Sequence, residues 1–540
     1  MDAKEILKGF NNAKSKRQTI ENTWKDLAYY VIPRKRGIQT KYEACDRMQF
    51  DVYDDTAIQS NLILAAGLSG YMTNASQRWF QVRPRDESLM NDADVANFFA
   101  RTEDIMYSAL ATSNFYQQIH EFYLDLGSLG TATLYEEEDP SENIRFYAIP
   151  PKEIYVIEND KERVDMIYRA CELTAYQAYN KFGKDNVGES IKKAVETEKE
   201  FDKPYEFVHY VGPRHKFNPK KKDSKNLPFF SYWVSVADNK IVKEGGYEEF
   251  PFFVTRFYKN SSEAYGYSAA FVSLPDILML NKMMKTYIEG AEISIYPAWL
   301  LESDSIIGTL DLRAAAINYQ RSPLSQGVAA QSLAPKMNAQ VAIDFINRTE
   351  NNIKAAFFTD LFLMLTQNVN MTATEVIERT QEKMLMLGPV LGRLQSELLS
   401  PKLKRTFSIL FRRKKLPPLP EKLKGQEYDI VYISPLAKAQ RAVQAKDMTT
   451  FMSLVVQMAG MVPDVLDNVD TDEMVQRLSK IYSVDPEVIR DDETRDIIRN
   501  QRAKMQEQEM RLQLLERASG IGKTIKEATP DDRQAARSVS

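Results

Sequence analysis

The longest regular pattern of apolar and polar residues runs from Met371 to Lys415. Thr372 and Glu375 have the spacing of a capping box, in which each side chain accepts a hydrogen bond from a backbone N–H at a helix start. Apolar residues then recur at mostly helical intervals: Leu387, Leu391, Leu394, Leu398, Leu403, Phe407, Leu410 and Phe411. We therefore predict a helix about 60 Å long over this stretch.

Two prolines interrupt the predicted helix. Pro389 lacks a backbone donor and crowds the carbonyl four residues earlier, and Gly388 precedes it, so we predict a kink there. Pro401 predicts a second bend or a break. On pattern alone, two or three ordinary core helices joined by short turns fit the same residues.

The first 267 residues alternate helical and strand patterns without a regular order. Helical patterns cover the start of the chain, residues 54–73, two segments within 92–129, the segment before Gly183, and residues 184–200. Strand patterns cover Trp79–Pro84, much of residues 131–172, and three aromatic-rich runs between 205 and 259. No βαβ repeat is present, which predicts an α+β fold in which helices predominate.

Two further helices flank an irregular segment. The first spans Ala269–Tyr296 and stops at Pro297. The second spans Asn338–Thr359 and carries four apolar residues on roughly one face: Val341, Phe345, Ile353 and Phe357. Residues 298–337 mix short strand-like runs with Gly, Ser and Pro, and residues 360–371 show no strong periodicity.

The chain after the long helix begins with a basic, proline-rich connection. Residues 427–434 then read as a strand that we expect to return to the sheet of the first half. Residues 436–518 are mostly helical, with breaks at Gly460–Pro463 and around Val484–Pro486. From Ser519 onward we expect disorder.

Composition narrows the class of protein. The length of 540 residues predicts roughly two to four sub-domains. The formal charge of −4 argues against a tight non-specific DNA binder, although DNA could still slide through a channel.

Two cysteines, Cys45 and Cys171, make no disulfide framework and indicate a reducing site of synthesis. The first residues resemble no signal peptide, and no uncharged apolar run is long enough to span a membrane.

We find no pattern typical of an enzyme or of a cofactor site. The run IGKT at Ile521–Thr524 has Arg517 where a phosphate-binding loop needs glycine. The three histidines, His120, His209 and His215, lack the spacing of zinc ligands. GxSxG and Cys/His nucleophile signatures are also absent from the sequence. No metal, no cofactor and no catalytic residue is therefore predicted.

The long helix also carries a family resemblance. TATEV at 372–376, LGPVLGRLQSELLSP at 387–401, RTFSILFR at 405–412 and PPLP at 417–420 resemble the head-to-tail connector (portal) family of short-tailed bacteriophages. Near the start, Arg17, Ile20-Glu21, Trp24 and Pro33 follow a pattern similar to the beginning of that family. The Gly130-Thr131-Ala132 turn and the IPPKEIY run at 149–155 also match.

The resemblance implies a division of the chain into named parts. These are an α/β wing (1–267), a stem helix (268–297), a small α/β clip (298–337), a second stem helix (338–359), a tunnel loop (360–372), a long kinked wing helix with a return strand (373–434), a helical crown (435–518) and a disordered tail (519–540).

The resemblance also implies a function and partners. The subunit would form a ring, usually of about twelve copies, at one capsid vertex, through which double-stranded DNA is packaged and ejected. It would assemble with scaffolding and major capsid proteins, dock the terminase large subunit, and later hold a tail adaptor protein. It would be made in the host cytoplasm and reside in the virion, without a membrane partner.

Candidate channel residues follow from this mapping. In the tunnel loop they are Gln367, Asn368, Asn370 and Met371, with residues 361–365 packing its base. On the stem they are Lys282, Lys285, Arg348 and Lys354, which could make weak, exchangeable contacts with phosphates. Salt bridges between neighbouring stem helices, with Glu289, Glu292 or Glu350, explain the same four residues equally well.

Two other classes of protein remain open from the sequence. A packaging enzyme, such as a terminase or nuclease component, would need the phosphate loop or a carboxylate metal motif that the chain lacks. A non-portal structural or scaffold protein should be more uniformly helical and polar than this chain, which is rich in aromatic residues and strands.

Overall fold

The computed structural model describes most of the chain. The described residues are 2–35, 37, 51–86, 89, 92–196, 200–218, 223–302, 311, 313, 316–320, 330–332, 339–364, 386–423, 425, 428–433, 435–460, 468–482 and 492–527. The chain divides into two compact units. The first comprises Met1–Gln81, Glu103–Leu416 and Ile430–Arg441, and the second comprises Val82–Thr102, Pro417–Asp429 and Ala442–Ser540.

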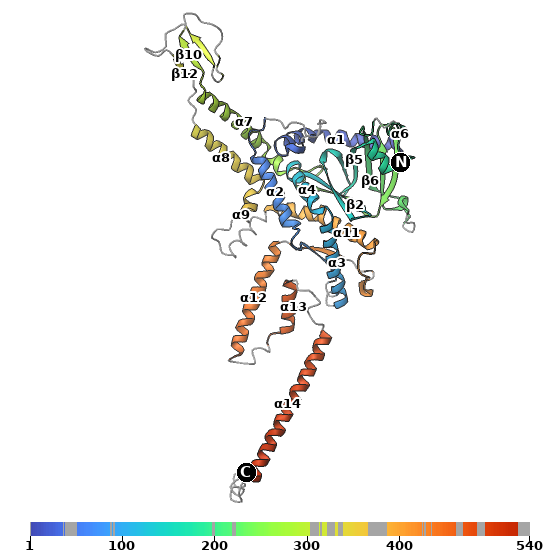
Figure 1. Ribbon diagram of the computed structural model, residues 1–540, viewed down its shortest axis with the longest axis vertical. Coiled ribbons are helices and arrows are strands. Elements are labelled where there is room, and N and C mark those ends of the chain that lie inside the picture. The colour runs from blue at the N-terminus through green and yellow to red at the C-terminus, as the bar shows by residue number, and fades with distance from the viewer. Residues whose placement is uncertain are drawn as a thin grey trace. The chain divides into compact units, whose positions relative to one another are not determined.

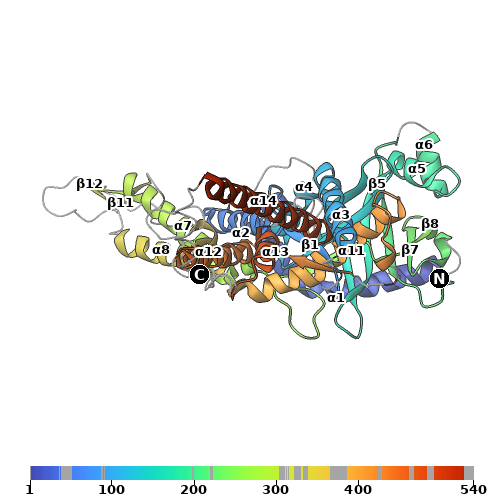
Figure 2. The same ribbon diagram turned by 90° about the horizontal axis from the view of Figure 1, so that it is seen from below.

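A five-stranded antiparallel sheet forms the centre of the first unit. Its strands follow chain order: β4 (Ile154–Glu158), β5 (Val164–Thr174), β6 (Pro204–Pro213), β7 (Phe229–Ser235) and β8 (Lys240–Tyr247). Alternate side chains point to opposite faces of the sheet. Tyr210 and Val208 of β6 therefore pack against α1 (Ala3–Tyr30), whereas Phe207 packs against α5 (Ala175–Phe182) and α6 (Glu189–Glu196). Figure 2 shows α1 and the α5–α6 pair on opposite sides of these strands.

A second antiparallel sheet packs beside the first and has the order β3-β2-β9. Its strands are β2 (Thr131–Asp139), β3 (Asn143–Ile149) and β9 (Phe252–Arg256). Tyr135, Phe252 and Val254 of this sheet share a buried cluster with Ile167 and Val211 of the first sheet. The helix α4 (Phe115–Leu129) leads directly into β2 and packs against α2 (Thr56–Met72). The helix α3 (Ala93–Thr112) precedes α4.

Two long helices project from this body (Figure 1). They are α7 (Ala269–Ile295) and α8 (Ala339–Ala356), and they pack against each other. Between them lies a small sheet of β10 (Trp299–Glu302), β11 (Ile317–Gln320) and β12 (Ala330–Ser332), in which β10 pairs parallel with β11 and antiparallel with β12. The two helices and the strand-like runs between them match the sequence prediction. Residues 359–364 form a short helix, α9 (Thr359–Met364), of which all but the first residue falls in the segment predicted as a tunnel loop.

The long wing helix is helical at every residue from 386 to 412. It contains a π-helical turn, Leu394–Leu399, followed by α11 (Ser400–Arg412). Of the two outcomes predicted at Pro401, a bend or a break, the break is therefore wrong, and the bend stays a prediction. In the π-helical turn the Ser400 N–H bonds to the Gln395 carbonyl, five residues earlier, and this wider turn accommodates a proline that a regular α-helix resists. The kink at Gly388 and Pro389 stays a prediction, because residues 365–385 lie outside the described residues.

The remaining helices lie after residue 434. They are α12 (Pro435–Ala459), α13 (Thr471–Tyr482) and α14 (Asp492–Glu527), separated at both predicted breaks. In the second unit, Arg499 of α14 donates two hydrogen bonds to Asp472 of α13, at 2.6 and 2.7 Å. The helix α14 continues past Ser519 to Glu527, so the expected start of disorder is misplaced. Once a helix is nucleated, each added residue gains a hydrogen bond, which explains the continuation.

The return strand β13 (Tyr428–Tyr432) pairs with β1 (Phe80–Pro84) in a two-stranded sheet of its own. We had expected this strand to join a larger sheet of the first half, and that prediction is wrong. Short 3-10 helices occur at Pro33–Lys35, Pro151–Glu153, Ser224–Asn226 and Glu421–Leu423. The α+β class with predominant helix is confirmed.

Candidate functional site

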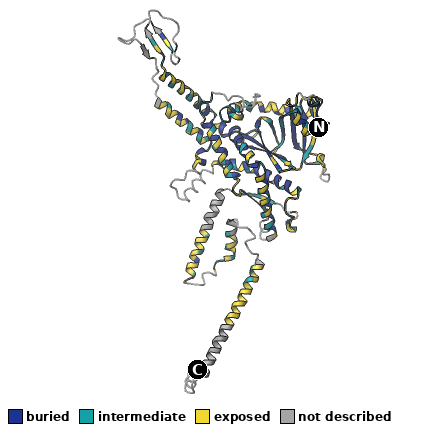
Figure 3. Ribbon diagram, viewed as in Figure 1, coloured by how far each residue is buried: buried dark blue, intermediate teal, exposed yellow. Residues whose placement is uncertain are grey.

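The projecting helices α7 and α8 are buried only near the body of the first unit (Figure 3). Buried residues of α7 end at Leu280, although the helix continues to Ile295. Near the body, Ile353 of α8 and Phe357, which directly follows α8, are fully buried, whereas Val341 and Phe345 near the tip are 48% and 57% exposed. The predicted apolar face of α8 is therefore covered along half its length. Near the tip, α8 therefore leaves two large apolar side chains exposed to solvent.

The start of α7 is fixed by hydrogen bonds to the end of α4 and the start of β2. The Ser268 hydroxyl caps α7 by accepting a hydrogen bond from the Phe271 N–H at 2.9 Å. The same hydroxyl donates to the Ser128 carbonyl at 2.8 Å, and the Gly266 N–H donates to the Thr131 hydroxyl at 2.8 Å. Ser268 is fully buried, so these bonds satisfy groups that water cannot reach.

Two glycines allow this close approach of backbones. Gly130 has a φ of 78°, the left-handed conformation that glycine adopts without strain. A Cβ on Gly130 would lie 2.5 Å from the Gly266 carbonyl oxygen, and a Cβ on Gly266 would lie 2.5 Å from the Gly130 carbonyl oxygen. The sequence marked Gly130 as the passage from helix to strand. The structure adds that it is also the point where the root of α7 touches the body.

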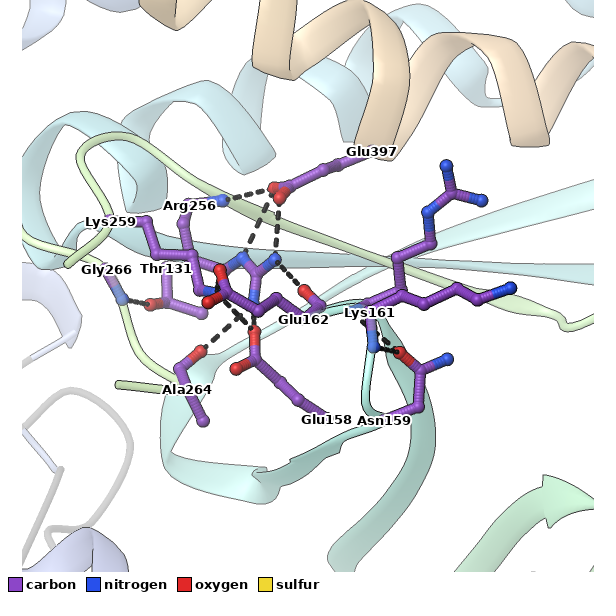
Figure 4. Close-up of polar contacts among 11 residues, drawn as sticks. Thr131, Glu158, Asn159, Lys161, Glu162, Arg256, Lys259, Ala264, Gly266 and Glu397 are labelled. Carbon is purple, nitrogen blue, oxygen red and sulfur yellow. Dashed lines mark hydrogen bonds and ion pairs between the residues drawn. The ribbon is translucent and has the colours of Figure 1, made fainter. Parts of the chain in front are cut away.

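A buried ion cluster lies beside this root and joins it to the long wing helix (Figure 4). Arg256, 2% exposed, forms ion pairs with Glu397 of the π-helical turn at 2.6 Å and with Glu158 of β4. Its guanidinium also donates to the carbonyls of Glu162 and Ala264, both at 3.3 Å. Lys259 pairs with Glu158 at 3.2 Å and with Glu162 at 2.6 Å.

Burial by itself would lower the pKa of Arg256, but the hydrogen bonds and charges of Glu397 and Glu158 outweigh burial and raise it. The guanidinium therefore stays charged. Because its donors are shared among three segments of chain, the cluster holds the start of α7, the β4–β5 turn and the long helix in one arrangement.

The four predicted stem cations differ in their surroundings. Lys282 and Arg348 are exposed and form no ion pair among the described residues. Lys285 lies 4.0 Å from Glu289, and Lys354 lies 3.0 Å from Glu350; both pairs are four residues apart on one helix. Both lysines thus pair with a predicted carboxylate, but on their own helix; salt bridges between neighbouring stem helices in an assembly stay a prediction. Side chains four residues apart on a helix reach each other more readily than side chains on separate helices.

The other predicted residues are only partly within the described part of the chain. Gln367, Asn368, Asn370, Met371, Thr372 and Glu375 lie outside the described residues. Gly388 and Pro389 lie on the exposed side of the long helix. Of the expected base of the tunnel loop, Leu361 and Phe362 are buried, and Phe362 packs onto Gly67 of α2, where a Cβ would come within 2.2 Å of its ring.

Comparisons with known proteins decide the family. Residues 3–489 match the model of the family described as "Bacteriophage head to tail connecting protein". The chain belongs to this family. It is 29% identical over its whole length to the portal protein of Salmonella phage epsilon15, of which it covers 98%. It is also 27% identical, over 95% of its length, to the probable portal protein of Bordetella phage BPP-1, of which it covers 93%.

In this connecting protein, sequence reasoning missed several buried charges. Lys402 and Arg405 of α11 are 0% and 1% exposed. The Lys402 ammonium lies 3.6 Å from the ring centre of Phe115 and within 6 Å of two further rings, those of Phe146 and Trp79. It has no hydrogen-bond partner among the described residues. The sequence did contain a sign of this burial. The two charged residues fall at helical intervals between apolar residues of the buried face: Leu398, Lys402, Arg405 and Ile409.

Glu136 of β2 is the carboxylate whose charge acts on Lys402. It is fully buried and accepts a hydrogen bond from the Thr406 hydroxyl at 2.8 Å. Burial raises the pKa of Glu136 to about 7, against the opposing charges of Arg405 and Lys402. Burial lowers the pKa of Lys402 to about 7, against the charge of Glu136. Nothing in the residue types of β2 predicts this pair, which exists only because β2 and α11 pack together.

The described ranges contain no group of three or more His, Cys, Asp or Glu side chains placed to hold a metal ion. Within the same ranges, none of the helices combines the length and the apolar character needed to cross a bilayer.

Proposed function

We propose that this connecting protein is a portal subunit that forms a ring channel for double-stranded DNA at one capsid vertex. The observation that carries the proposal is the similarity, over nearly the full length of both proteins, to the portal protein of phage epsilon15. The projecting pair α7 and α8, with a small sheet between them, supports it, because the apolar side chains of Val341 and Phe345 are exposed near its tip, as expected of a surface that packs against neighbouring copies.

The parts of the subunit have separate roles in this proposal. The pair α7 and α8 acts as the stem, residues 298–337 as the clip, residues 360–372 as the tunnel loop and residues 435–518 as the crown. The wing, residues 1–267 with the long helix, carries the stem on its rigid body. Lys282 and Arg348 contact passing phosphates, since neither charge is engaged by a described partner.

The position of the ring at the capsid vertex determines which proteins it binds. The ring, of about twelve copies, assembles with scaffolding and major capsid proteins, binds the terminase large subunit during packaging and then a tail adaptor protein. The subunit is made in the host cytoplasm and ends in the virion. Its work is mechanical: it holds DNA in a channel and carries other proteins.

The native mass of the purified protein, with negative-stain images, tests the proposal. A ring of about twelve subunits with a central hole is the expected result. If the protein stays a monomer or dimer, the measurement is repeated with scaffolding protein. Failure to form rings in that mixture as well would overturn the proposal.

A further inference from the structure

The first helix, α1, has a buried face and a solvent face of very different character. Its buried face packs on the five-stranded sheet through Ile6, Phe10 and Ala13. Farther along, the Trp24 indole N–H donates to the Leu129 carbonyl at 2.9 Å. Arg17 donates to the carbonyls of Pro151 and Ile154 at 2.9 and 2.7 Å. The helix is thus held rigidly, with one side turned to water.

The solvent face presents positive charge without any exposed carboxylate between residues 8 and 25. Lys8, Lys14, Lys16 and Lys25 are exposed, and every other exposed position in this range is Asn, Gln, Ser or Thr. Glu21, the acidic residue of the range, is half-buried and is bound by Arg17 at 2.6 Å. None of the four lysines takes part in an ion pair within the described ranges, although the chain as a whole has a formal charge of −4.

These residue types are the ones that contact nucleic-acid backbones. Lys, Asn, Gln, Ser and Thr side chains are among the groups that donate hydrogen bonds to phosphate oxygens. Lys8 and Lys25 are separated by about 25 Å along the helix, at 1.5 Å per residue. A duplex carries about one phosphate charge per 1.7 Å of its axis, so several phosphates fall within that length.

The same face lacks what other partners need. Protein interfaces depend on aromatic or aliphatic anchors, and single-stranded nucleic acids bind through stacking on aromatic rings. Between residues 8 and 25, the aromatic side chains of α1, Phe10 and Trp24, are both buried. The partly exposed Ile20 is the one large apolar side chain that reaches solvent in this range.

We propose that the solvent face of α1 binds the phosphate backbone of duplex DNA without reading its sequence. This contact lies on the wing and is separate from the stem cations Lys282 and Arg348. It gives the subunit a second DNA-binding surface, which does not depend on a central channel.

Fluorescence anisotropy of a labelled random-sequence 30-base-pair duplex, titrated with full-length protein between 50 and 200 mM salt, tests the proposal. The variant K8Q/K14Q/K16Q removes three of the charges. The matched control K161Q/K240Q/K243Q removes three exposed lysines elsewhere on the wing, none of them in an ion pair within the described ranges. Native mass of each variant shows whether assembly is unchanged, so failed ring formation can be told apart from failed DNA binding.

The α1 variant should bind at least about tenfold more weakly at low salt, and the slope of log affinity against log salt should fall by about 2–3. The control should match the unmodified protein. Equal binding by the α1 variant and the control overturns the proposal. So does a loss confined to K282Q/R348Q, which would leave the channel proposal standing. Competition by poly-glutamate as strong as that by unlabelled duplex would assign the face to an acidic protein instead.

Discussion

The carboxylate of Glu397 accepts three hydrogen bonds from Arg256, a residue 141 positions earlier in the chain. The Arg256 backbone N–H donates at 3.0 Å, and its guanidinium donates at 2.6 and 3.3 Å. Glu397 belongs to the π-helical turn, and Arg256 ends the strand from which the chain runs to α7. The long wing helix and the root of the projecting pair are therefore held together through one carboxylate.

Removing this carboxylate should destabilise the first unit. In E397Q the buried guanidinium of Arg256 keeps Glu158 but loses its second counter-charge, at a cost of about 2–4 kcal/mol. The urea midpoint of the first unit should fall accordingly. E162Q, which removes a largely exposed carboxylate of the same cluster, serves as control and should change the midpoint much less. Equal midpoints for the two variants would show that Glu397 has no special part in stability.

The pair Glu136 and Lys402 should make stability depend on pH in two opposite directions. The folded pKa of Glu136 is about 7, above the ordinary value of 4.5, so the native state binds more protons between these values and stability falls as pH rises toward 7. The folded pKa of Lys402 is also about 7, below the ordinary 10.5, so the unfolded state binds more protons above pH 7 and stability rises again. Together the two groups give a stability minimum near neutral pH.

K402M should remove the alkaline rise. Methionine fills a similar volume among Phe115, Phe146 and Trp79 without a charge, so stability near pH 7 should be unchanged or higher by up to about 4 kcal/mol. Urea midpoints from pH 5 to pH 10 measure both effects. K404M, two residues along α11 and on its exposed side, is the control and should keep the pH profile of the unmodified protein. An unchanged profile in K402M would contradict the role given to this lysine.

His209 should make the protein lose stability in acid. Its ring stacks on that of Trp233, with the ring centres 4.1 Å apart, and its Nε2 lies 2.9 Å from the Ser231 hydroxyl oxygen. Burial holds the pKa of His209 well below 6.5. The unfolded state gains a proton below about pH 6.5 and the native state does not, so stability falls by about 1.4 kcal/mol per pH unit.

The variant H209F keeps a ring against Trp233 and removes the titrating group. Because Glu136 has the opposite effect over the same range, the comparison is a difference: on going from pH 7 to pH 5, the urea midpoint of H209F should change more favourably than that of the unmodified protein. The exposed His215 supplies the control, H215F, whose acid response should resemble that of the unmodified protein. The same change in midpoint in H209F as in H215F would show that His209 does not contribute to the acid response.

G130A should disrupt the root of α7. The alanine would hold a left-handed conformation and place its Cβ 2.5 Å from the Gly266 carbonyl oxygen, so we expect a loss above about 3 kcal/mol. G392A adds the same methyl group at an exposed position of the long helix with no atom within 4 Å, and should stabilise by about 0.5–1 kcal/mol. Thermal unfolding compares the two. Similar shifts for both variants would mean that the close approach at Gly130 is not required.

The double variant K282A/R348A should lower DNA packaging at least about tenfold while rings still form. K285A/K354A is the matched control, since these two charges are already engaged by Glu289 and Glu350 on their own helices. Packaged DNA per procapsid, measured after nuclease treatment, gives the comparison. Normal packaging by K282A/R348A in intact rings would remove these residues from the channel surface.

The sequence by itself determined which segments become helices and strands, and in what order. Periodicity placed α7 and α8 to within a few residues, because apolar spacing and a terminal proline act locally. It also predicted the helical segments after residue 434 and their breaks. The residues of the long helix were also specific enough to indicate the family, and the family match covers residues 3–489.

Only the tertiary structure decided which charges are buried and what they bind. Arg256, Glu397, Lys402 and Glu136 are ordinary charged residues in the sequence, and their pairing depends on elements more than a hundred residues apart. The helix is not broken at Pro401, one of the two outcomes predicted there, for a related reason: a π-helical turn, with Glu397 of that turn bound by Arg256, accommodates the proline. Local rules give the energy of a segment alone, whereas burial and pairing arise when segments pack together.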